Sequence, residues 1–223
     1  MLPEQGVFIV ADGMGGHAAG EVASEMAVQT IARGLAGVVG KSENDATQMM
    51  TRAIIGANSA IFRRTMDEPE KRGMGTTATA MIVNGSRYIL GQVGDSRAYL
   101  LRDSVLTQIT KDHSYVQEQV DAGYLTPDQA RTHPYSNVIT RCVGANSDVV
   151  PDVYVGTLQS DDVFVLASDG LTGMLEDHEL LGILNSDPQP AVIVDHMISE
   201  ANRRGGLDNI TVVIIRIDRM GES

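Results

Sequence analysis

The pattern that most constrains this fold is an apolar strand ending in Asp-Gly, which the chain contains twice. The two copies read VFIVADG at Val7–Gly13 and VFVLASDG at Val163–Gly170. Short continuous apolar runs are typical of strands covered on both faces. A carboxylate at the end of such a strand is costly to bury unless a partner neutralises it. If the two strands are neighbours, Asp12 and Asp169 meet at one rim.

Two further acids stand at strand ends. Asp208 comes just before the apolar run Ile210–Ile217, which mirrors the first pattern. Asp95 follows Gly94 between two predicted strands, where aspartate is also typical of a simple turn, and alone it favours that interpretation. Converging carboxylates repel one another unless cations lie among them. Oxygen ligands without cysteine or histidine at ligand spacing favour Mg²⁺ or Mn²⁺ over structural zinc.

Composition narrows the class of protein. The 223 residues are 43% hydrophobic and carry a net charge of −12, so we expect one globular domain over 1–223 and neither nucleic acid nor an anionic membrane as a partner. Cys142 is the single cysteine, which excludes an intramolecular disulfide and fits a reducing compartment. No apolar run approaches the roughly 20 residues that span a bilayer. We therefore expect a cytoplasmic protein.

The predicted elements alternate between helix pairs and strand blocks. Helices are expected where apolar residues recur every three or four positions and strands where β-branched and aromatic residues cluster between turns. Closely spaced strands favour antiparallel pairing. Helices are predicted at 20–39, 46–64, 114–123, 127–131, 171–184 and 191–204, and strands at 7–11, 77–83, 88–93, 98–101, 105–109, 149–155, 163–167 and 210–217.

The segment from about His113 to Cys142 has weaker core character than its surroundings. It contains the two short predicted helices and the turn His133-Pro134, and it is inserted between strands. Both histidines are more typical of hydrogen-bonded surface residues than of ligands. Long insertions of this kind often carry function, so this one is predicted to be a mobile flap that faces a substrate.

Five short motifs follow one another between about Val7 and Ile217. They are Ala11-Asp12-Gly13-Met14-Gly15-Gly16-His17, Gly75-Thr76-Thr77-Ala78, Gly91-Gln92-Val93-Gly94-Asp95-Ser96-Arg97, Ser168-Asp169-Gly170-Leu171 and Asp208-Asn209-Ile210-Thr211. Each alone is weak, but all five in this order are specific. Through them the chain resembles the metal-dependent protein phosphatases of the PPM, or PP2C-like, family in their compact bacterial form.

The resemblance implies an α+β fold: a four-layer α/β/β/α sandwich of two antiparallel sheets flanked by helix pairs. It also implies a site. Asp12 resembles the acid that bridges two metals, Gly13 the residue that offers its carbonyl to one of them, and Asp169 and Asp208 ligands of the other. Asp95 together with Asp169 matches the acids of a third, weaker metal, which changes our interpretation of Asp95 from turn former to ligand.

The implied reaction is hydrolysis of phosphoserine and phosphothreonine in proteins by a water or hydroxide that bridges two Mg²⁺ or Mn²⁺ ions. Asp12, Asp169 and Asp208 are the expected catalytic acids. The expected partners are phosphorylated proteins of a Ser/Thr kinase pathway, and the expected state is a monomer.

Family members usually carry an additional N-terminal strand with an arginine that grips the substrate phosphate. Here only residues 1–6 precede the first strand. We therefore expect reduced activity and an exposed sheet edge, whether the sequence has been trimmed or is a truly shortened member. The alternative hypothesis is a catalytically weakened phosphoprotein-binding or regulatory module of the same fold, although retention of all four acids argues against it.

Overall fold

The structure is a computed structural model that describes residues 3–15 and 17–218. Its first sheet has the strand order β1-β4-β5-β8, with every neighbouring pair antiparallel. Val10 at the end of β1 lies opposite Thr79 at the start of β4, and Thr79 lies opposite Gln92 at the end of β5. The strands are β1 (Val7–Val10), β4 (Ala78–Asn84), β5 (Arg87–Val93) and β8 (Asp152–Thr157).

The second sheet has the order β10-β9-β6-β7 and is also antiparallel. Ala167 at the end of β9 lies opposite Arg97 at the start of β6 and Val212 at the start of β10. The residues just outside these three strand ends therefore come to one edge of the sheet. The strands are β6 (Arg97–Arg102), β7 (Val105–Gln108), β9 (Val163–Ala167) and β10 (Val212–Arg216), and β2 (Gly13–Met14) pairs with β3 (Gly75–Thr76) separately.

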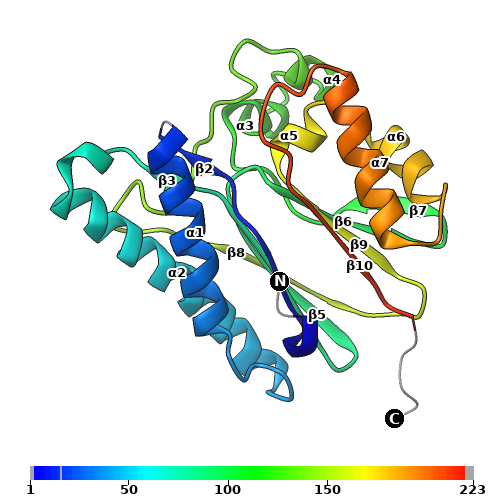
Figure 1. Cartoon of the computed structure of the whole chain (residues 1–223), viewed down its shortest axis with the longest axis horizontal. Coiled ribbons are helices and arrows are strands. Elements are labelled where there is room, and N and C mark those ends of the chain that lie inside the picture. The colour runs from blue at the N-terminus through cyan, green and yellow to red at the C-terminus, as the bar shows by residue number, and fades with distance from the viewer. Residues whose placement is uncertain (1–2, 16, 219–223) are drawn as a thin grey trace.

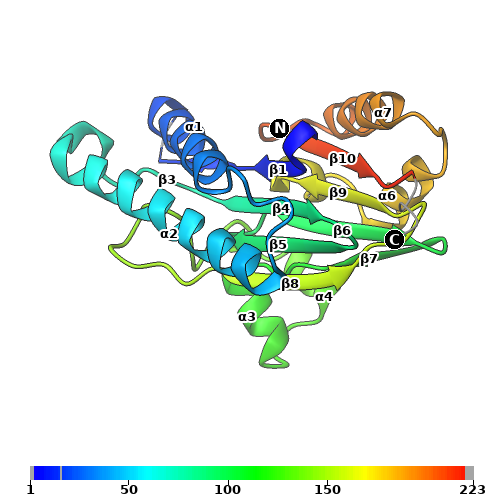
Figure 2. The same cartoon turned by 90° about the horizontal axis from the view of Figure 1, so that it is seen from below.

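Helices cover the outer face of each sheet (Figures 1 and 2). The pair α1 (His17–Gly34) and α2 (Glu43–Asp67) packs on the first sheet, whereas α5 (Asp169–Thr172), α6 (Asp177–Leu184) and α7 (Pro190–Arg203) pack on the second. The short helices α3 (Tyr115–Asp121) and α4 (Pro127–Arg131) pack on each other, and α4 contacts α5 through a hydrogen bond from Arg131 to the Thr172 carbonyl. Short 3-10 turns occur at Pro3–Gln5 and Pro69–Lys71.

Three apolar clusters fill the spaces between these four layers. Side chains alternate along the strands, so Ile82 and Ile89 face α1 and α2 while Met81 and Leu90 face the other sheet. Phe164 is fully buried between the sheets, where its ring meets that of Tyr88 edge-on at 5.0 Å. The predicted α/β/β/α sandwich is confirmed.

Several predicted boundaries were wrong for local reasons. The first helix ends at Gly34 and not near residue 39, although Leu35 and Val38 beyond it are fully buried and so extended the apolar pattern. The helix expected over 171–184 is two helices, and the second begins at a capping box formed by Glu176 and Glu179.

The strand expected at 149–155 runs from Asp152 to Thr157, beyond Pro151. The strand expected at 210–217 begins only at Val212, because the amide of Thr211 bonds the Ser168 hydroxyl instead of a neighbouring strand. Gly16, which belongs to the first motif, lies outside the described residues.

Candidate metal centre and groove

Asp12 is held by its backbone at the end of β1. Its amide donates to the Thr77 hydroxyl at 2.9 Å, and its carbonyl accepts from the Thr77 amide and the Thr76 hydroxyl, both at 2.8 Å. The next residue, Gly13, packs on α1, where a Cβ at Gly13 would stand 2.0 Å from the carbonyl oxygen of Gly20. Only glycine fits at this position, so the peptide after Asp12 lies directly against α1. Together with the bonds to Thr76 and Thr77, this contact fixes the backbone of Asp12 through neutral groups.

Asp95 lies in the turn that joins β5 of the first sheet to β6 of the second. The Ser96 hydroxyl lies 2.7 Å from that of Thr77, so one threonine contacts both Asp12 and the Asp95 turn. Gln92 donates to the carbonyls of Gly94 and Ser96, each at 2.9 Å. The turn is therefore tied to the end of β1.

Asp169 and Asp208 belong to two turns that pack directly on each other. The Ser168 hydroxyl accepts from the Thr211 amide at 3.0 Å and donates to the Asn209 carbonyl at 3.2 Å. A Cβ on Gly170 would stand 2.3 Å from that same carbonyl oxygen. This close approach explains why glycine follows the acid in the second copy of the strand pattern.

The four acids influence one another electrostatically. Burial first, then Asp169 and to a smaller degree Asp208 and Asp95, raise the pKa of Asp12 to about 7. Burial together with Asp169 and Asp112 raises the pKa of Asp95 to about 7. Burial also raises the pKa of Asp169, with a further contribution from Asp208. Desolvated carboxylates this close together require a positive partner to stay ionised at neutral pH.

The four acids make few direct contacts with one another. The Asp12 and Asp169 carboxyl groups are within hydrogen-bonding reach of each other, whereas Asp208 is exposed and accepts from the Asn209 amide at 2.7 Å. Among the described residues, no three His, Cys, Asp or Glu side chains converge closely enough to surround an ion as they stand. The oxygen-only donor set fits a hard divalent cation.

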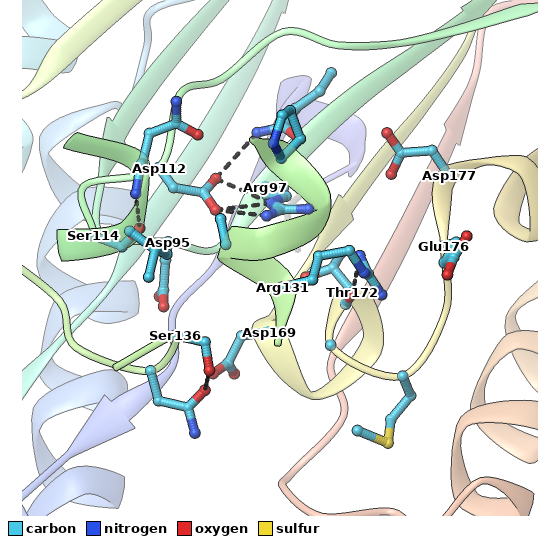
Figure 3. A pocket seen from close by; sticks show the side chains of 18 of the residues that line it. Asp95, Arg97, Asp112, Ser114, Arg131, Ser136, Asp169, Thr172, Glu176 and Asp177 are labelled. Atoms are coloured by element: carbon cyan, nitrogen blue, oxygen red, sulfur yellow. Dashed lines mark hydrogen bonds and ion pairs between the residues drawn. The ribbon is translucent and has the colours of Figure 1, made fainter. Parts of the chain in front are cut away.

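A groove with a volume of about 770 Å³ opens beside these acids. We call this cavity the groove (Figure 3). Asp12 does not line it but contacts Asp169, which does. One wall belongs to α3, α4 and the chain after them, and the other to α5, α6 and their connection. The polar lining includes Asp95, Arg97, Asp112, Ser114, Gln117, Asp128, Arg131, Ser136, Asn137, Asp169, Glu176, Asp177, His178 and Asp208.

The sequence-predicted acids are thus brought to one rim, but their hydroxyl partners were missed as positioning residues. Thr77, Ser96 and Ser168 were present in the quoted motifs without an assigned role. The available signal was a hydroxyl residue directly beside an acid or a glycine, which is too common in turns to identify a site.

Two packed antiparallel sheets that bring four carboxylates to one rim beside a groove are the arrangement of a metal-dependent hydrolase. The protein phosphatase 2C family matches residues 2–197. The chain belongs to this family, and the predicted membership is confirmed.

Similar proteins extend over nearly the whole chain. It is 39% identical over 215 residues to the serine/threonine phosphatase stp of Listeria monocytogenes, covering 96% of this chain and 85% of that protein. It is 42% identical over 210 residues to the serine/threonine protein phosphatase PstP of Mycobacterium tuberculosis, covering 93% of this chain and 40% of that protein.

Solved structures agree with the fold. The M. tuberculosis phosphatase PstP/Ppp superposes with a TM-score of 0.89 at 40% identity, covering 96% of this chain and 88% of that one. The PstP catalytic domain in complex with two manganese ions gives a TM-score of 0.86 at 39% identity, with the same coverage. Stp1 of Staphylococcus aureus gives 0.90 at 32% identity, covering 96% and 84%. Separately, none of the described helices is long and apolar enough to cross a membrane.

Proposed function

We propose that this chain hydrolyses phosphoserine and phosphothreonine esters in proteins, with Mg²⁺ or Mn²⁺ bound at the acidic rim. The observation that carries the proposal is the meeting of Asp12, Asp95, Asp169 and Asp208 at one end of both sheets, next to the groove. Such a cluster is costly to the fold without cations, and it opens onto space for a substrate.

In this proposal Asp12 would be shared by two ions, with the Gly13 carbonyl completing the site of one and Asp169 and Asp208 that of the other. Asp95 with Asp169 would hold a third, weaker ion. To contribute, Asp208 would give up its bond from the Asn209 amide. Bound divalent cations activate a water and neutralise charge on the phosphoryl oxygens.

The chain's own residues hold the geometry and shape the substrate path. Thr77 and Ser168 fix the backbone beside Asp12 and Asp169, so ion binding requires movement of side chains, Asp208 above all, and little movement of the backbone. Residues 113–142 act as the flap, since α3, α4 and the chain after them form one wall of the groove. The volume of the groove, about 770 Å³, leaves room for residues that flank a phosphorylated side chain, which supports a protein substrate.

We further propose a monomer in the cytoplasm whose substrates are products of a Ser/Thr kinase. All four acids come from one chain, so the site needs no second subunit. The single cysteine supports a reducing compartment.

The test is phosphate release from a phosphothreonine peptide with and without Mn²⁺, for the unmutated chain and for Asp12→Ala and Asp169→Ala. We expect Mn²⁺-dependent release that falls at least a hundredfold in either variant, which corresponds to about 2.7 kcal/mol of transition-state stabilisation. A thermal unfolding scan supplies a second measurement, because an ion that binds the folded state raises the Tm.

The two measurements separate the candidate functions. Mn²⁺-dependent release together with a raised Tm supports the phosphatase. A raised Tm without any release contradicts it and favours the phosphoprotein-binding or regulatory module. Release that persists in both variants would show that the acids are not the metal ligands.

A further inference from the structure

Two arginines, Arg97 and Arg131, line the groove. The first forms an ion pair with a neighbouring acid, whereas the second forms none with the described residues. Arg97 is neutralised by Asp112, which accepts from its Nε at 3.0 Å and from its Nη2 at 2.7 Å. A further bond runs from Nη1 to the Tyr99 hydroxyl at 3.2 Å. Arg97 therefore has its charge neutralised by Asp112, and each of its three guanidinium nitrogens has a protein partner.

Arg131, on α4, has few partners. Its Nη1 donates to the Thr172 carbonyl at 3.3 Å, and none of the ion pairs between described residues involves it. A guanidinium has five N–H donors, so most of the hydrogen-bonding capacity of Arg131 is not used by the described protein groups. The side chain is exposed and lines the groove. The groove also contains Asp128, Glu176 and Asp177, yet none of these lies within ion-pair distance of Arg131.

The position of Arg131 relative to the acidic rim follows from α5. This helix of four residues begins at Asp169 and ends at Thr172. Carbonyls of a helix point toward its C-terminal end, so the guanidinium bonded to Thr172 stands beyond that end. With a rise of about 1.5 Å per residue, Thr172 lies roughly one helical turn along the axis from Asp169, and the guanidinium lies one hydrogen bond further. Figure 3 likewise shows Arg131 against Thr172, apart from Asp95 and Asp169.

A phosphate held at the rim is thus separated from Arg131 by a distance that a peptide covers in about two extended residues. We propose that Arg131 is a specificity-determining residue that binds the carboxylate of an Asp or Glu side chain near the phosphorylated residue of the substrate. Planar guanidinium groups suit carboxylates because they can form two parallel hydrogen bonds. This inference rests on the proposed phosphatase function and adds a preference among its substrates.

A purely structural role has to be separated from this one. The bond to Thr172 also joins α4 to α5, so a mutation could loosen that wall of the groove. Arg131→Gln retains a donor for the Thr172 carbonyl and removes the charge. Arg63→Gln is the matched control, since Arg63 is exposed on α2, on the other side of the molecule.

The experiment crosses these enzymes with a set of peptides. Each phosphothreonine peptide carries either Asp or Asn two residues before or two residues after the phosphorylated position, so the paired peptides differ in one charge. Steady-state KM and kcat are measured with saturating Mn²⁺, and p-nitrophenyl phosphate serves as a substrate without flanking residues. Comparing KM for the four combinations of enzyme (unmutated or Arg131→Gln) and peptide (Asp or Asn) isolates the interaction between Arg131 and the peptide carboxylate.

In at least one placement we expect the unmutated enzyme to show a KM about fivefold lower for the Asp peptide than for the Asn peptide, a size typical of a charged pair at a partly exposed site. Arg131→Gln removes this preference with little change in kcat, Arg63→Gln keeps it, and all three enzymes hydrolyse p-nitrophenyl phosphate equally.

Two results would overturn the inference alone: an Asp preference that survives in Arg131→Gln, or an equal loss on both peptides and on p-nitrophenyl phosphate. The second result would indicate a structural role or a contact with the phosphate that is cleaved. If the unmutated chain releases no phosphate from any substrate with Mn²⁺, the proposed function itself fails.

Discussion

At the scale of single residues, neutral hydroxyls fix the peptides that carry the acids. Thr77 bonds the backbone of Asp12, Ser96 adjoins Asp95, and Ser168 ties the Asp169 turn to the Asp208 turn. Each hydroxyl can donate and accept at once, so it holds two segments without adding charge. The carboxylates themselves remain available to a cation.

Gly170 offers a sharp test of the close contact between the two metal-site turns. In Gly170→Ala the new Cβ would stand 2.3 Å from the Asn209 carbonyl oxygen, which is backbone and cannot move aside easily. We expect the free energy of unfolding to fall by about 1–3 kcal/mol, as overpacking typically costs. We also expect the Mn²⁺ concentration for half-maximal activity to rise.

The matched control is Gly182→Ala in α6, where a Cβ meets nothing within 4 Å. That change should stabilise the protein by about 0.5–1 kcal/mol, because alanine favours a helix over glycine. Urea unfolding measures both variants. If Gly170→Ala matched the control in stability and Mn²⁺ dependence, the close packing of the two turns would contribute neither to stability nor to metal binding.

The acids could be predicted from the sequence because each stands at the end of an apolar run beside a glycine or a turn. Asp95 was ambiguous until the family resemblance was considered, since its local pattern is that of an ordinary turn. The roles of Thr77 and Ser96 could not be predicted, because they depend on contacts between residues 19 positions apart. Arg131 has no local signal, because its proposed role follows from the fact that it forms no ion pair with any acid in the described part of the chain.

At the scale of elements, His113 connects the start of the flap to the Asp95 turn. Its amide donates to the Gly94 carbonyl at 2.9 Å, and its Nδ1 accepts from the Gly94 amide at 3.1 Å. A neutral ring that accepts at Nδ1 carries its proton on Nε2, which lies 3.2 Å from Asp152 on β8. The ring therefore joins the turn, the flap and the first sheet.

Protonation of His113 would break the bond from Gly94, so stability should depend on pH through this residue. Burial, with Arg141 as a smaller cause, lowers its pKa below the ordinary 6.5, against the opposite effects of Asp152 and Asp112. Because the unfolded chain takes up this proton at a higher pH, the contribution is complete above about pH 6.5 and is lost as the pH falls toward the folded-state pKa.

We therefore expect His113→Gln to lose less stability than the unmutated chain when the pH falls from 7.5 to 5.5. Urea unfolding at several pH values in this range measures the difference, and contributions common to both proteins cancel. Parallel curves for the two proteins would contradict the assignment.

Most elements could be predicted from the sequence, and the errors have physical causes. The prediction of α4 was correct to the residue because Thr126 and Pro127 are a strong helix start. The end of α1 was misplaced because Leu35 and Val38 are buried although they lie beyond the helix. Their spacing continues the apolar pattern of the helix into the following turn. Sheet membership could not be read from strand periodicity, since central strands such as β4 and β5 are buried on both faces.

At the scale of the whole molecule, the rim depends on both sheets at once. Asp12 ends a strand of the first sheet, Asp169 and Asp208 flank strands of the second, and Asp95 lies in the connection between them. The packing of sheet on sheet therefore sets the distances among the acids. Phe164 lies at the centre of that packing, against Tyr88 of the other sheet.

We expect Phe164→Ala to lower the free energy of unfolding by about 3–5 kcal/mol, as large cavities in a core do. Because the cavity lies between the sheets, Mn²⁺ affinity should fall as well. Phe62→Ala, on a half-buried position of α2, is the comparison and should affect stability less and Mn²⁺ affinity little. Urea unfolding and Mn²⁺ titration of activity measure the two effects, and unchanged Mn²⁺ affinity in Phe164→Ala would show that the rim does not depend on the core.

The hydroxyl contacts at the rim also affect how this fold can change over evolutionary time. Because Thr77 and Ser168 hold the backbone whatever the charge of the neighbouring side chains, replacing an acid abolishes metal-dependent chemistry without removing the support of the surrounding turns. The groove, with Arg131 on its wall, remains formed. A phosphatase of this architecture is therefore one substitution away from a protein that still recognises its former substrates but no longer dephosphorylates them.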